Sequence, residues 1–587
     1  MASYRIVFLL IHLFCTSSAQ TVQNTNCRAL PGDQSWPSTT EWNNLNSTVN
    51  GRLVATVPIA SPCHEPNYSA TECAYLQANW ANPSLHWNSS SSLIAPYFAT
   101  LGNQSCNPFS SEQSLCSLGN LVNYAVNVST PNDAVAAIQF AKNHNIRFVI
   151  RNTGHDYLGK STGAGSLAVW THNLKDISFS DWKSDYFTGK VMKIGAGIQG
   201  FEALEAAHDA GFVTVGGYTQ GGGHSALSSN FGMAADQALS WEVVTASGNV
   251  VTASRTENKD LYWALSGGGG GTYGVIISLT VRVYPDTVVS GASLEFSATG
   301  GNTSIETFWK GVEAFHTYLP GMVDAGTMVG YGASSSVFRI IGMTAYNKTK
   351  ADVQALLANF TDKLTTLGIN FTVAYTQYPT YLDHYNQSLG PLPYGPWGGP
   401  GVNTGGGRLI SRSVVQENNK AYVATIRNVT NAGIPYTGVA LNVSSPHITS
   451  TADNALLPAW RDALIHVILT IPWNYSAPIS EMVAAQYHMI NEIIPQFEVL
   501  TPGGGTYLNE GNFRKPDWQQ TFYGKNYRKL LGIKNKWDPD QIFYATTAVG
   551  SEAWRIEADG RMCRTNDTTT SVLKLSSGGK RFKRVEN

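Results

Sequence analysis

Three glycine-rich segments between residues 150 and 275 constrain the fold more than any other feature of this sequence. The first, Arg151-Asn-Thr-Gly-His-Asp-Tyr-Leu-Gly159, directly follows the strand-like residues 146–150. The second spans residues 216–225 and the third spans residues 266–274. Glycine lets a backbone lie close against a ligand, and successive N–H groups in such a turn can surround a phosphate. Each segment alone is equally compatible with a flexible loop.

The surrounding sequence alternates between strand and helix patterns. Residues 124–128 alternate like a strand, Thr130-Pro131 is typical of a helix start, and apolar residues then recur at helical spacing from 134 to 141. The alternation ends in the β-rich residues 275–283. We therefore expect one domain over residues 118–286.

The rest of the chain predicts a second domain and a returning segment. A helix over 351–367 and a strand over 466–471 indicate an α+β domain at 287–500. Residues 501–555 carry Trp and Tyr among polar residues, so we expect them to fold back on the first domain. The Ser/Thr/Gly/Lys-rich tail, 566–587, is predicted to be disordered.

The N-terminus and the composition indicate a secreted protein without nucleic-acid or membrane partners. Residues 1–19 have a basic start, an apolar run and a small-residue cleavage pattern, which predicts a signal peptide. No later apolar run is long enough to span a bilayer. Charged residues make up only 13% of the chain and the net charge is −1, which argues against binding to nucleic acid or anionic lipid.

The cysteines and the glycosylation sequons also indicate a secreted protein. Removal of residues 1–19 leaves six cysteines, five of them in the predicted N-terminal segment 20–117, which favours three disulfides over free core thiols. The only pair that we predict is Cys106–Cys116, whose short loop closes easily. Sequons predict N-glycosylation at Asn46, Asn67, Asn88, Asn103, Asn127, Asn302, Asn347, Asn359, Asn370, Asn386, Asn428, Asn442, Asn474 and Asn566.

Two familiar motifs are incomplete, and no metal motif is present. Residues 195–200 match G-x-G-x-x-G, but no Asp or Glu lies between Asp209 and Asp236 to hold a ribose, so we expect a plain strand-to-helix turn. Residues 223–227 begin like the G-x-S-x-G elbow of serine hydrolases but end in Leu227. The sequence has no C-x-x-C or H-E-x-x-H, and we expect no metal site.

Taken together, the glycine-rich segments resemble the FAD-binding domain of the vanillyl-alcohol oxidase and p-cresol methylhydroxylase superfamily. The likeness is greatest to berberine-bridge-enzyme-like oxidases, including fungal isoamyl alcohol oxidase. It extends to the closing segment Tyr507-Leu-Asn-Glu510, Trp518 and 524–539. The resemblance implies an α+β fold with a two-subdomain PCMH-type FAD-binding domain, an α+β substrate domain and a C-terminal berberine-bridge-like segment that returns to the FAD domain.

The resemblance also implies the cofactor and its ligands. In the family, the His of the R-x-x-G-H loop is bonded to the flavin 8α-methyl carbon, and here that residue is His155. Many relatives add a Cys link, whose position falls near Ala210 here, but no Cys occurs between Cys116 and Cys563. We therefore expect FAD held by His155 alone. Further predicted cofactor contacts are Arg151, Asn152, Thr153, Gly154, Asp156, Ser161, Gly216, Gly217, Gly222, Gly223, His224, Gly232, Asp236, Val275, Ile276 and Asn526.

The implied activity is oxidation of an alcohol, with O2 as acceptor and H2O2 as product. The candidate catalytic bases are Tyr507 and Glu510, with His224 behind them, while packing of Tyr507 in the core is an equal alternative. Aromatic residues between 376 and 397 either form a substrate wall or pin a Pro/Gly-rich loop. Oxidative cyclisation or desaturation of a natural product stays open, as does a flavin-free ligand-binding glycoprotein. The sequence does not indicate the oligomeric state.

Overall fold

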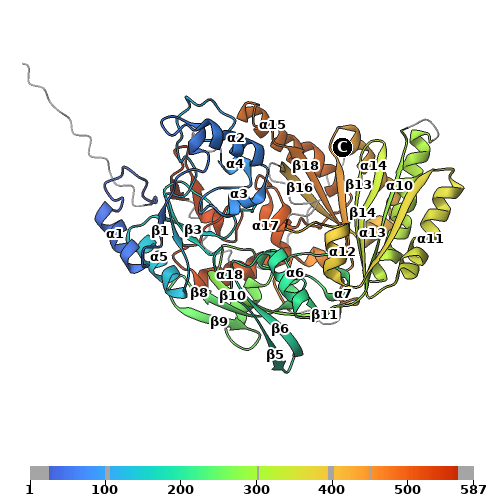
Figure 1. The fold of residues 1–587 in the computed structure, drawn as a ribbon, viewed down its shortest axis with the longest axis horizontal. Coiled ribbons are helices and arrows are strands. Elements are labelled where there is room, and N and C mark those ends of the chain that lie inside the picture. The colour runs from blue at the N-terminus through green and yellow to red at the C-terminus, as the bar shows by residue number, and fades with distance from the viewer. Residues whose placement is uncertain (1–25, 100–105, 300–302, 394–401, 449–452, 566–587) are drawn as a thin grey trace, which may run out of the picture.

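The computed structural model describes residues 26–99, 106–299, 303–393, 402–448 and 453–565. The predicted signal peptide 1–19 and the tail 566–587 lie outside these ranges. Figure 1 shows the N-terminal residues and the strands up to residue 282 on one side of the molecule, and the large sheet formed by residues 289–472 on the other. The predicted α+β architecture is confirmed.

The first sheet of the first domain has four strands in the order β1-β2-β4-β3, in which β2 and β3 run parallel to β4 and β1 runs antiparallel to β2. Helix α5 begins at Pro131 because Thr130 and Asp133 form a capping box, in which backbone N–H groups of residues 129 and 130 donate to the Asp133 carboxylate. The bounds are β1 Leu53–Ala55, β2 Tyr124–Asn127, β3 Arg147–Arg151, β4 Ser166–Trp170 and α5 Pro131–Asn143.

The second sheet of this domain is antiparallel, in the order β5-β6-β10-β8-β9, with the fully buried β10 at its centre. The G-x-G-x-x-G match lies where β6 ends. A Cβ at Gly197 would lie 2.1 Å from the carbonyl oxygen of His172, so the glycine serves a tight turn, as expected. The bounds are β5 Ile177–Ser184, β6 Phe187–Gly195, β8 Ala238–Val244, β9 Val250–Ser254, β10 Val275–Arg282, α6 Gly200–Asp209 and α9 Lys259–Leu265, with the short pair β7 Phe212–Val213 and β11 Tyr284–Pro285.

The second domain is built on a seven-stranded antiparallel sheet in the order β15-β12-β14-β13-β17-β18-β16. Its long helices pack through a shared apolar core that includes Phe308, Phe315 and Phe360. The strands are β12 Val289–Ser297, β13 Thr327–Ala333, β14 Val337–Tyr346, β15 Phe371–Tyr378, β16 Val402–Ser411, β17 Tyr436–Ala440 and β18 Ala463–Pro472. The helices are α10 Ile305–Asp324, α11 Lys350–Thr366, α12 Tyr381–Ser388, α13 Arg412–Glu417, α14 Asn419–Asn431, α15 Ile479–His488 and α16 Ile494–Glu498.

The C-terminal segment returns to the first domain, as the sequence predicted. Leu530 and Ile533 of α18 (Tyr527–Trp537) share an apolar cluster with Trp241 of β8. Phe543 forms a parallel bridge with Phe148, and the strands β19 Trp554–Ile556 and β20 Met562–Arg564 follow. Before them, α17 spans Trp518–Tyr523 and a 3₁₀ turn, η5, spans Leu508–Glu510.

Three disulfides join all six cysteines that follow the predicted signal peptide: Cys27–Cys563, Cys63–Cys73 and Cys106–Cys116. The predicted local pair is confirmed, and the alternative of free thiols is wrong. Cys27–Cys563 closes a loop of 536 residues and ties the two ends of the described chain together.

The N-terminal segment carries α1 Thr39–Thr48, α2 Ala70–Asn79, α3 Pro83–Trp87 and α4 Pro96–Ala99, and the second glycine-rich segment leads into α7 Ser228–Phe231 and α8 Ala234–Gln237.

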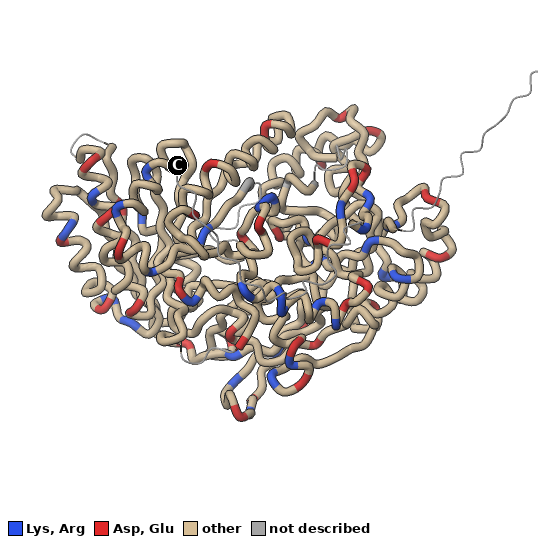
Figure 2. Tube along the Cα trace, turned by 180° about the vertical axis from the view of Figure 1, so that it is seen from behind, with Lys and Arg blue, Asp and Glu red and all other residues tan. Residues whose placement is uncertain are grey.

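The surface agrees with the low charge content of the sequence. Figure 2 shows basic and acidic residues interspersed over the face that it presents. Among the described residues, no helix combines the length and the apolar character needed to cross a membrane.

Candidate active site

Arg151 anchors the first glycine-rich loop to the N-terminal segment. Its side chain is fully buried, and Nη2 donates to the carbonyl oxygens of His86, Ser89 and Ser92 at 3.3, 2.8 and 2.5 Å. Nε and Nη1 have no hydrogen-bond partner among the residues that the structure describes. A Cβ at Gly154 would lie 2.3 Å from Nη1, so only glycine lets the loop pass this close to the guanidinium. Burial lowers the pKa of Arg151 to about 9.

Asp156 shapes the end of the same loop. Its carboxylate accepts hydrogen bonds from the backbone N–H groups of Leu158, Lys160 and Ser161, at 3.2, 2.6 and 3.1 Å. Asn152 is also held by protein, since its Nδ2 donates to the carbonyl oxygen of Ala196 at 2.8 Å, while its buried Oδ1 has no partner. Asp156 therefore stabilises the turn of the loop, whereas Asn152 keeps its Oδ1 without a partner in the described structure.

His155 lies in the first glycine-rich loop, and its imidazole forms a hydrogen bond with its own backbone. Its ring centroid lies 5.6 Å from that of Tyr157 and 5.8 Å from that of Tyr218. The protein around the ring lowers the pKa of His155, because burial disfavours the imidazolium. The imidazole is therefore neutral at ordinary pH and has a nitrogen lone pair available for bonding.

Tyr218, which lies beside His155, has a strained backbone conformation. Its φ is 50° and its side chain is 59% exposed, which is unusual for a bulky aromatic residue. The Nδ2 group of Asn509 donates to the Tyr218 carbonyl oxygen at 3.2 Å. Next to it, a Cβ at Gly216 or Gly217 would meet no atom within 4 Å, so this part of the second glycine-rich segment borders open space.

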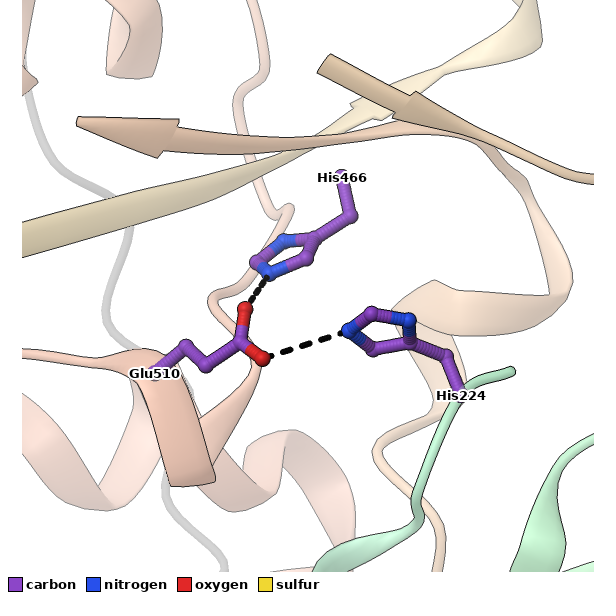
Figure 3. Close-up of side chains that lie close together, drawn as sticks. All are labelled: His224, His466 and Glu510. Carbon is purple, nitrogen blue, oxygen red and sulfur yellow. Dashed lines mark hydrogen bonds and ion pairs between the residues drawn. The ribbon is translucent and has the colours of Figure 1, made fainter. Parts of the chain in front are cut away.

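The continuation of that segment brings three ionisable side chains together, although they are far apart in the sequence (Figure 3). His224 Nε2 lies 3.2 Å from Glu510 Oε1, and His466 Nε2 lies 2.6 Å from Glu510 Oε2. His466 of β18 is fully buried, whereas the side chains of His224 and Glu510 are 18% and 22% exposed. Glu510 therefore bridges a buried histidine of the large sheet and a histidine that has access to solvent.

The electrostatics of this cluster fix its protonation. Burial opposes ionisation of Glu510, but the hydrogen bonds from His224 and His466, together with the positive charge of either ring when it is protonated, outweigh it and hold the pKa of this carboxyl well below its usual range. Burial lowers the pKa of His466, and the Glu510 bond offsets only part of the effect. An ionised carboxylate only accepts hydrogen bonds, so we assign the donating N–H of both imidazoles to Nε2. In the neutral form of either ring, this assignment leaves a lone pair on Nδ1.

Tyr507 packs against this cluster. Its side chain is 1% exposed, and its hydroxyl oxygen accepts hydrogen bonds from the backbone N–H of Gly223 at 3.2 Å and from Asn509 Nδ2 at 2.7 Å. Burial, with the nearby charge of Glu510, raises the pKa of Tyr507 far above its usual value. The tyrosine is therefore neutral and a poor base in this setting.

Six other predicted cofactor residues make contacts within the protein. Asp236, which is 1% exposed, accepts hydrogen bonds from Arg461 Nη1 and Nη2 at 3.0 and 2.7 Å. Asn526 Nδ2 donates to the carbonyl oxygens of residues 455 and 456. Val275 and Ile276 lie buried at the start of β10. Gly222 and Gly232 have φ values of 120° and 92°, and both pack tightly, because a Cβ would lie 2.7 Å from a neighbouring side chain.

The predicted aromatic wall is located only in part. Tyr381 is 3% exposed and packs in the apolar cluster that also contains Tyr507. Tyr394 and Trp397 lie outside the described residues. Trp460 borders the cluster together with Tyr507, and its ring centroid lies 5.5 Å from that of His466 and 6.2 Å from that of His224.

Two functional candidates were missed from the sequence. His466 lies within an apolar strand, and nothing in the local sequence indicates that it pairs with Glu510, 44 residues later. Lys160 follows the first glycine-rich loop, and its buried Nζ has no hydrogen-bond partner. The donor atoms of His224, His466 and Glu510 also lie within 4.8 Å of one another, as in a site that could accept a metal ion. The expectation that no metal binds is untested.

The free groups match the FAD that the resemblance implies. Arg151 Nε and Nη1 and Lys160 Nζ are buried cationic atoms without partners, which suits an anionic ligand. Gly216 and Gly217 border open space for a ligand, and His155 offers a free imidazole nitrogen. Arg151, Lys160, the glycine-rich segments and His155 are thus the residues that would hold the cofactor, whose ring system would supply hydride chemistry.

Comparisons with known proteins agree with this assignment. Residues 122–254 match the model of the FAD binding domain, and residues 506–550 match the model described as berberine and berberine like. The FAD-linked oxidoreductase ZEB1 of Gibberella zeae is 49% identical over 551 residues, which cover 92% of this chain and 95% of that protein. The bifunctional decalin synthase calF of Penicillium decumbens is 39% identical over 579 residues, covering 95% and 99%.

A solved structure confirms the fold. The crystal structure of the VAO-type flavoprotein MtVAO615 from Myceliophthora thermophila C1 superposes with a TM-score of 0.87 at 41% identity, covering 92% of this chain and 100% of that chain. The alternative of a flavin-free binding protein is set aside by these matches. The chain belongs to the family of FAD-linked oxidoreductases that comprises vanillyl-alcohol-oxidase-type and berberine-bridge-like flavoproteins.

Proposed function

We propose that this FAD-linked oxidoreductase is a secreted oxidase that converts an alcohol into a carbonyl compound. The FAD that His155, Arg151, Lys160 and the glycine-rich segments would hold would supply the hydride acceptor, with O2 as the terminal oxidant, so that one alcohol and one O2 would give one carbonyl product and one H2O2. The protein supplies the remaining step, which is removal of the hydroxyl proton.

The observation that carries this proposal is the His224–Glu510–His466 cluster. Glu510 is ionised and accepts the Nε2–H of His224, so the imidazole is oriented and its Nδ1 is free to accept a proton. When Nδ1 takes the proton, the carboxylate 3.2 Å from Nε2 stabilises the resulting imidazolium. His466, bonded to the other carboxylate oxygen at 2.6 Å, fixes the position of Glu510. We assign His224 as the base and Glu510 and His466 as its positioning residues.

Tyr507 and Glu510 are weaker candidates for the base itself. The pKa of Tyr507 is raised and no cation contacts its oxygen, so a phenolate is disfavoured. Glu510 holds its charge so firmly that its carboxylate has little tendency to accept a proton. This ordering differs from the sequence-based one, which placed His224 behind both residues.

We further propose that His155 alone attaches the flavin. The position of the His155 imidazole beside the exposed Tyr218 supports this attachment. The position near Ala210, where many relatives carry a cysteine, has none here, and every cysteine in the described part of the chain is in a disulfide. A covalent link would keep the cofactor with the enzyme after secretion.

Secretion is supported by the three disulfides and by the exposure of the sequons. The side chains of Asn67, Asn88, Asn347, Asn359, Asn370, Asn428 and Asn474 are exposed, and those of Asn46, Asn127 and Asn386 are partly exposed. Asn442 is an exception to the predicted sites: it is 6% exposed and its Nδ2 donates to Asp324 at 2.8 Å, so this packing leaves no room for a glycan. Asn103, Asn302 and Asn566 lie outside the described residues.

The proposal is tested by mixing the purified enzyme anaerobically with a panel of small primary alcohols and hydroxylated aromatic compounds. A substrate bleaches the flavin absorbance, and admission of O2 restores it with one H2O2 formed per carbonyl product. His224→Phe should bind the same alcohol but bleach about 10²- to 10⁴-fold more slowly, which is the usual contribution of a general base. Bleaching without a carbonyl product would contradict alcohol oxidation.

A second candidate function is oxidative cyclisation of a natural product. It is favoured by the relative named as a bifunctional decalin synthase, which is 39% identical over nearly the whole chain. The same flavin and base would then act on a larger substrate whose oxidised form closes a ring. Product analysis by NMR spectroscopy separates the two, because both reactions remove two hydrogens but simple oxidation of an alcohol leaves the ring count unchanged.

A further inference from the structure

Lys160 carries a charge that the described protein leaves unpaired. Its Nζ is buried and makes no hydrogen bond. The buried Lys534 is a useful contrast, because its Nζ donates to the Thr272 carbonyl, to Asp538 Oδ2 and to the Phe543 carbonyl at 2.5–2.7 Å. A buried ammonium group normally has such partners, since desolvation of an unpaired charge is costly.

The groups around Lys160 do not supply a partner. The nearest acid along the chain, Asp156, accepts three backbone N–H groups, one of them from Lys160 itself at 2.6 Å. Lys160 Nζ lies 3.8 Å from the point where a Cβ of Gly269 would stand, and that point is 3.4 Å from the hydroxyl of Tyr523 and 3.8 Å from Leu508 Cδ1. Burial accordingly lowers the pKa of Lys160 to about 8, which the charge of Asp156 only partly opposes.

Lys160 Nζ lies between the first and the third glycine-rich segments. Lys160 ends the loop that carries His155, and Gly269 belongs to the third segment, where φ is +100°. Leu508 adjoins Tyr507 in the C-terminal segment. The free ammonium thus lies where the loop, the third glycine-rich segment and the closing segment meet, next to the residues assigned to cofactor and substrate.

We propose that Lys160 binds an anionic group of the FAD. FAD offers negative charge in two places: the diphosphate, which is always charged, and the pyrimidine side of the isoalloxazine ring, which gains charge when the flavin is reduced. In either case Lys160 Nζ donates a charge-assisted hydrogen bond to oxygen or nitrogen of the cofactor. The inference depends on FAD binding but not on the alcohol as substrate.

The test compares Lys160→Met, which keeps the length of the side chain, with wild type and with the control Lys536→Met, whose exposed ammonium pairs with Asp260. Flavin content per folded protein and the dissociation constant for sulfite, which adds to oxidised flavin and places negative charge on the ring, are both read from absorbance. If the partner is the diphosphate, flavin content falls at least several-fold while circular dichroism shows a folded chain.

If the partner is the ring, flavin content is unchanged and the sulfite dissociation constant rises about 10-fold or more, the ratio expected when one hydrogen bond to a charged group is lost. Lys160→Arg should restore part of either effect because it keeps the charge. If Lys160→Met does not fold, Lys160→Gln is measured in the same way. Flavin content and sulfite affinity that both match Lys536→Met would overturn the proposal, whereas a wild type without flavin would refute the cofactor itself.

Discussion

Replacement of Glu510 by glutamine is the sharpest probe of the proton-accepting cluster. The amide keeps the shape of the carboxylate but offers one acceptor oxygen and one NH2 donor. The carboxylate now accepts from His224 at 3.2 Å and from His466 at 2.6 Å, so in Glu510→Gln one imidazole must face the NH2 group. If that imidazole is His224, its proton moves to Nδ1 and the lone pair proposed to accept the substrate proton is lost.

The magnitude follows from the hydrogen bond that the variant weakens. A hydrogen bond to a charged group contributes about 1.5–3 kcal/mol, and each 1.4 kcal/mol is a factor of about ten. Stabilisation of the imidazolium by Glu510 should therefore be worth about 10- to 150-fold in the rate of flavin reduction. The change should appear in the rate constant at saturating alcohol rather than in alcohol affinity.

The assay is anaerobic stopped-flow absorbance, which follows flavin bleaching alone. Glu498→Gln is the matched control, because Glu498 is a carboxylate of similar exposure that pairs with Arg408 and Lys515. We expect Glu498→Gln to reduce its flavin at the wild-type rate. A Glu510→Gln rate within twofold of wild type, with full flavin content, would refute the assignment of His224 as a base oriented by Glu510.

Three further predictions follow from the same contacts. Arg461→Met should lower the free energy of unfolding by about 3–5 kcal/mol, since it leaves buried Asp236 without its cation; urea denaturation measures this, and a loss below 1 kcal/mol would contradict it. Replacing Cys27 and Cys563 together by serine should cost about 2–5 kcal/mol, seen as a lower melting temperature, and an unchanged value would mean that this disulfide does not constrain the unfolded chain. The pKa of Glu510 is depressed in the folded protein, so its stabilising effect is complete above the ordinary carboxyl pKa of about 4.3 and declines as pH falls toward the folded pKa. The difference in unfolding free energy between wild type and Glu510→Gln should therefore shrink below about pH 4. A difference that grows below this pH would contradict the prediction.

Local patterns in the sequence predicted the elements that position the site. The Thr130-Pro131 start, the strand at 146–150 and the β-rich end at 275–283 correspond to α5, β3 and β10. These elements depend on capping, proline and periodicity within a few residues, which a single sequence displays. The short-loop disulfide Cys106–Cys116 was predictable for the same reason.

Contacts between distant segments were not predictable in this way. His466 lies on β18, next to the edge strand β16 of the large sheet, and its pairing with Glu510 depends on how the closing segment returns to this strand. The Cys27–Cys563 pair spans 536 residues. Lys160 was missed because a sequence does not show whether a lysine is buried or paired. Only the folded structure shows that Lys160 Nζ is buried and has no partner among the described residues.

The central claim, a flavin oxidoreductase whose FAD is attached through His155, is tested most directly by acid precipitation. Purified wild type and His155→Ala are denatured in acid, and the absorbance of pellet and supernatant is recorded. We predict yellow colour that stays with the wild-type pellet and moves to the supernatant, or is missing from the start, in His155→Ala. Colour released from the wild-type pellet, or retained by the variant, would contradict attachment through His155.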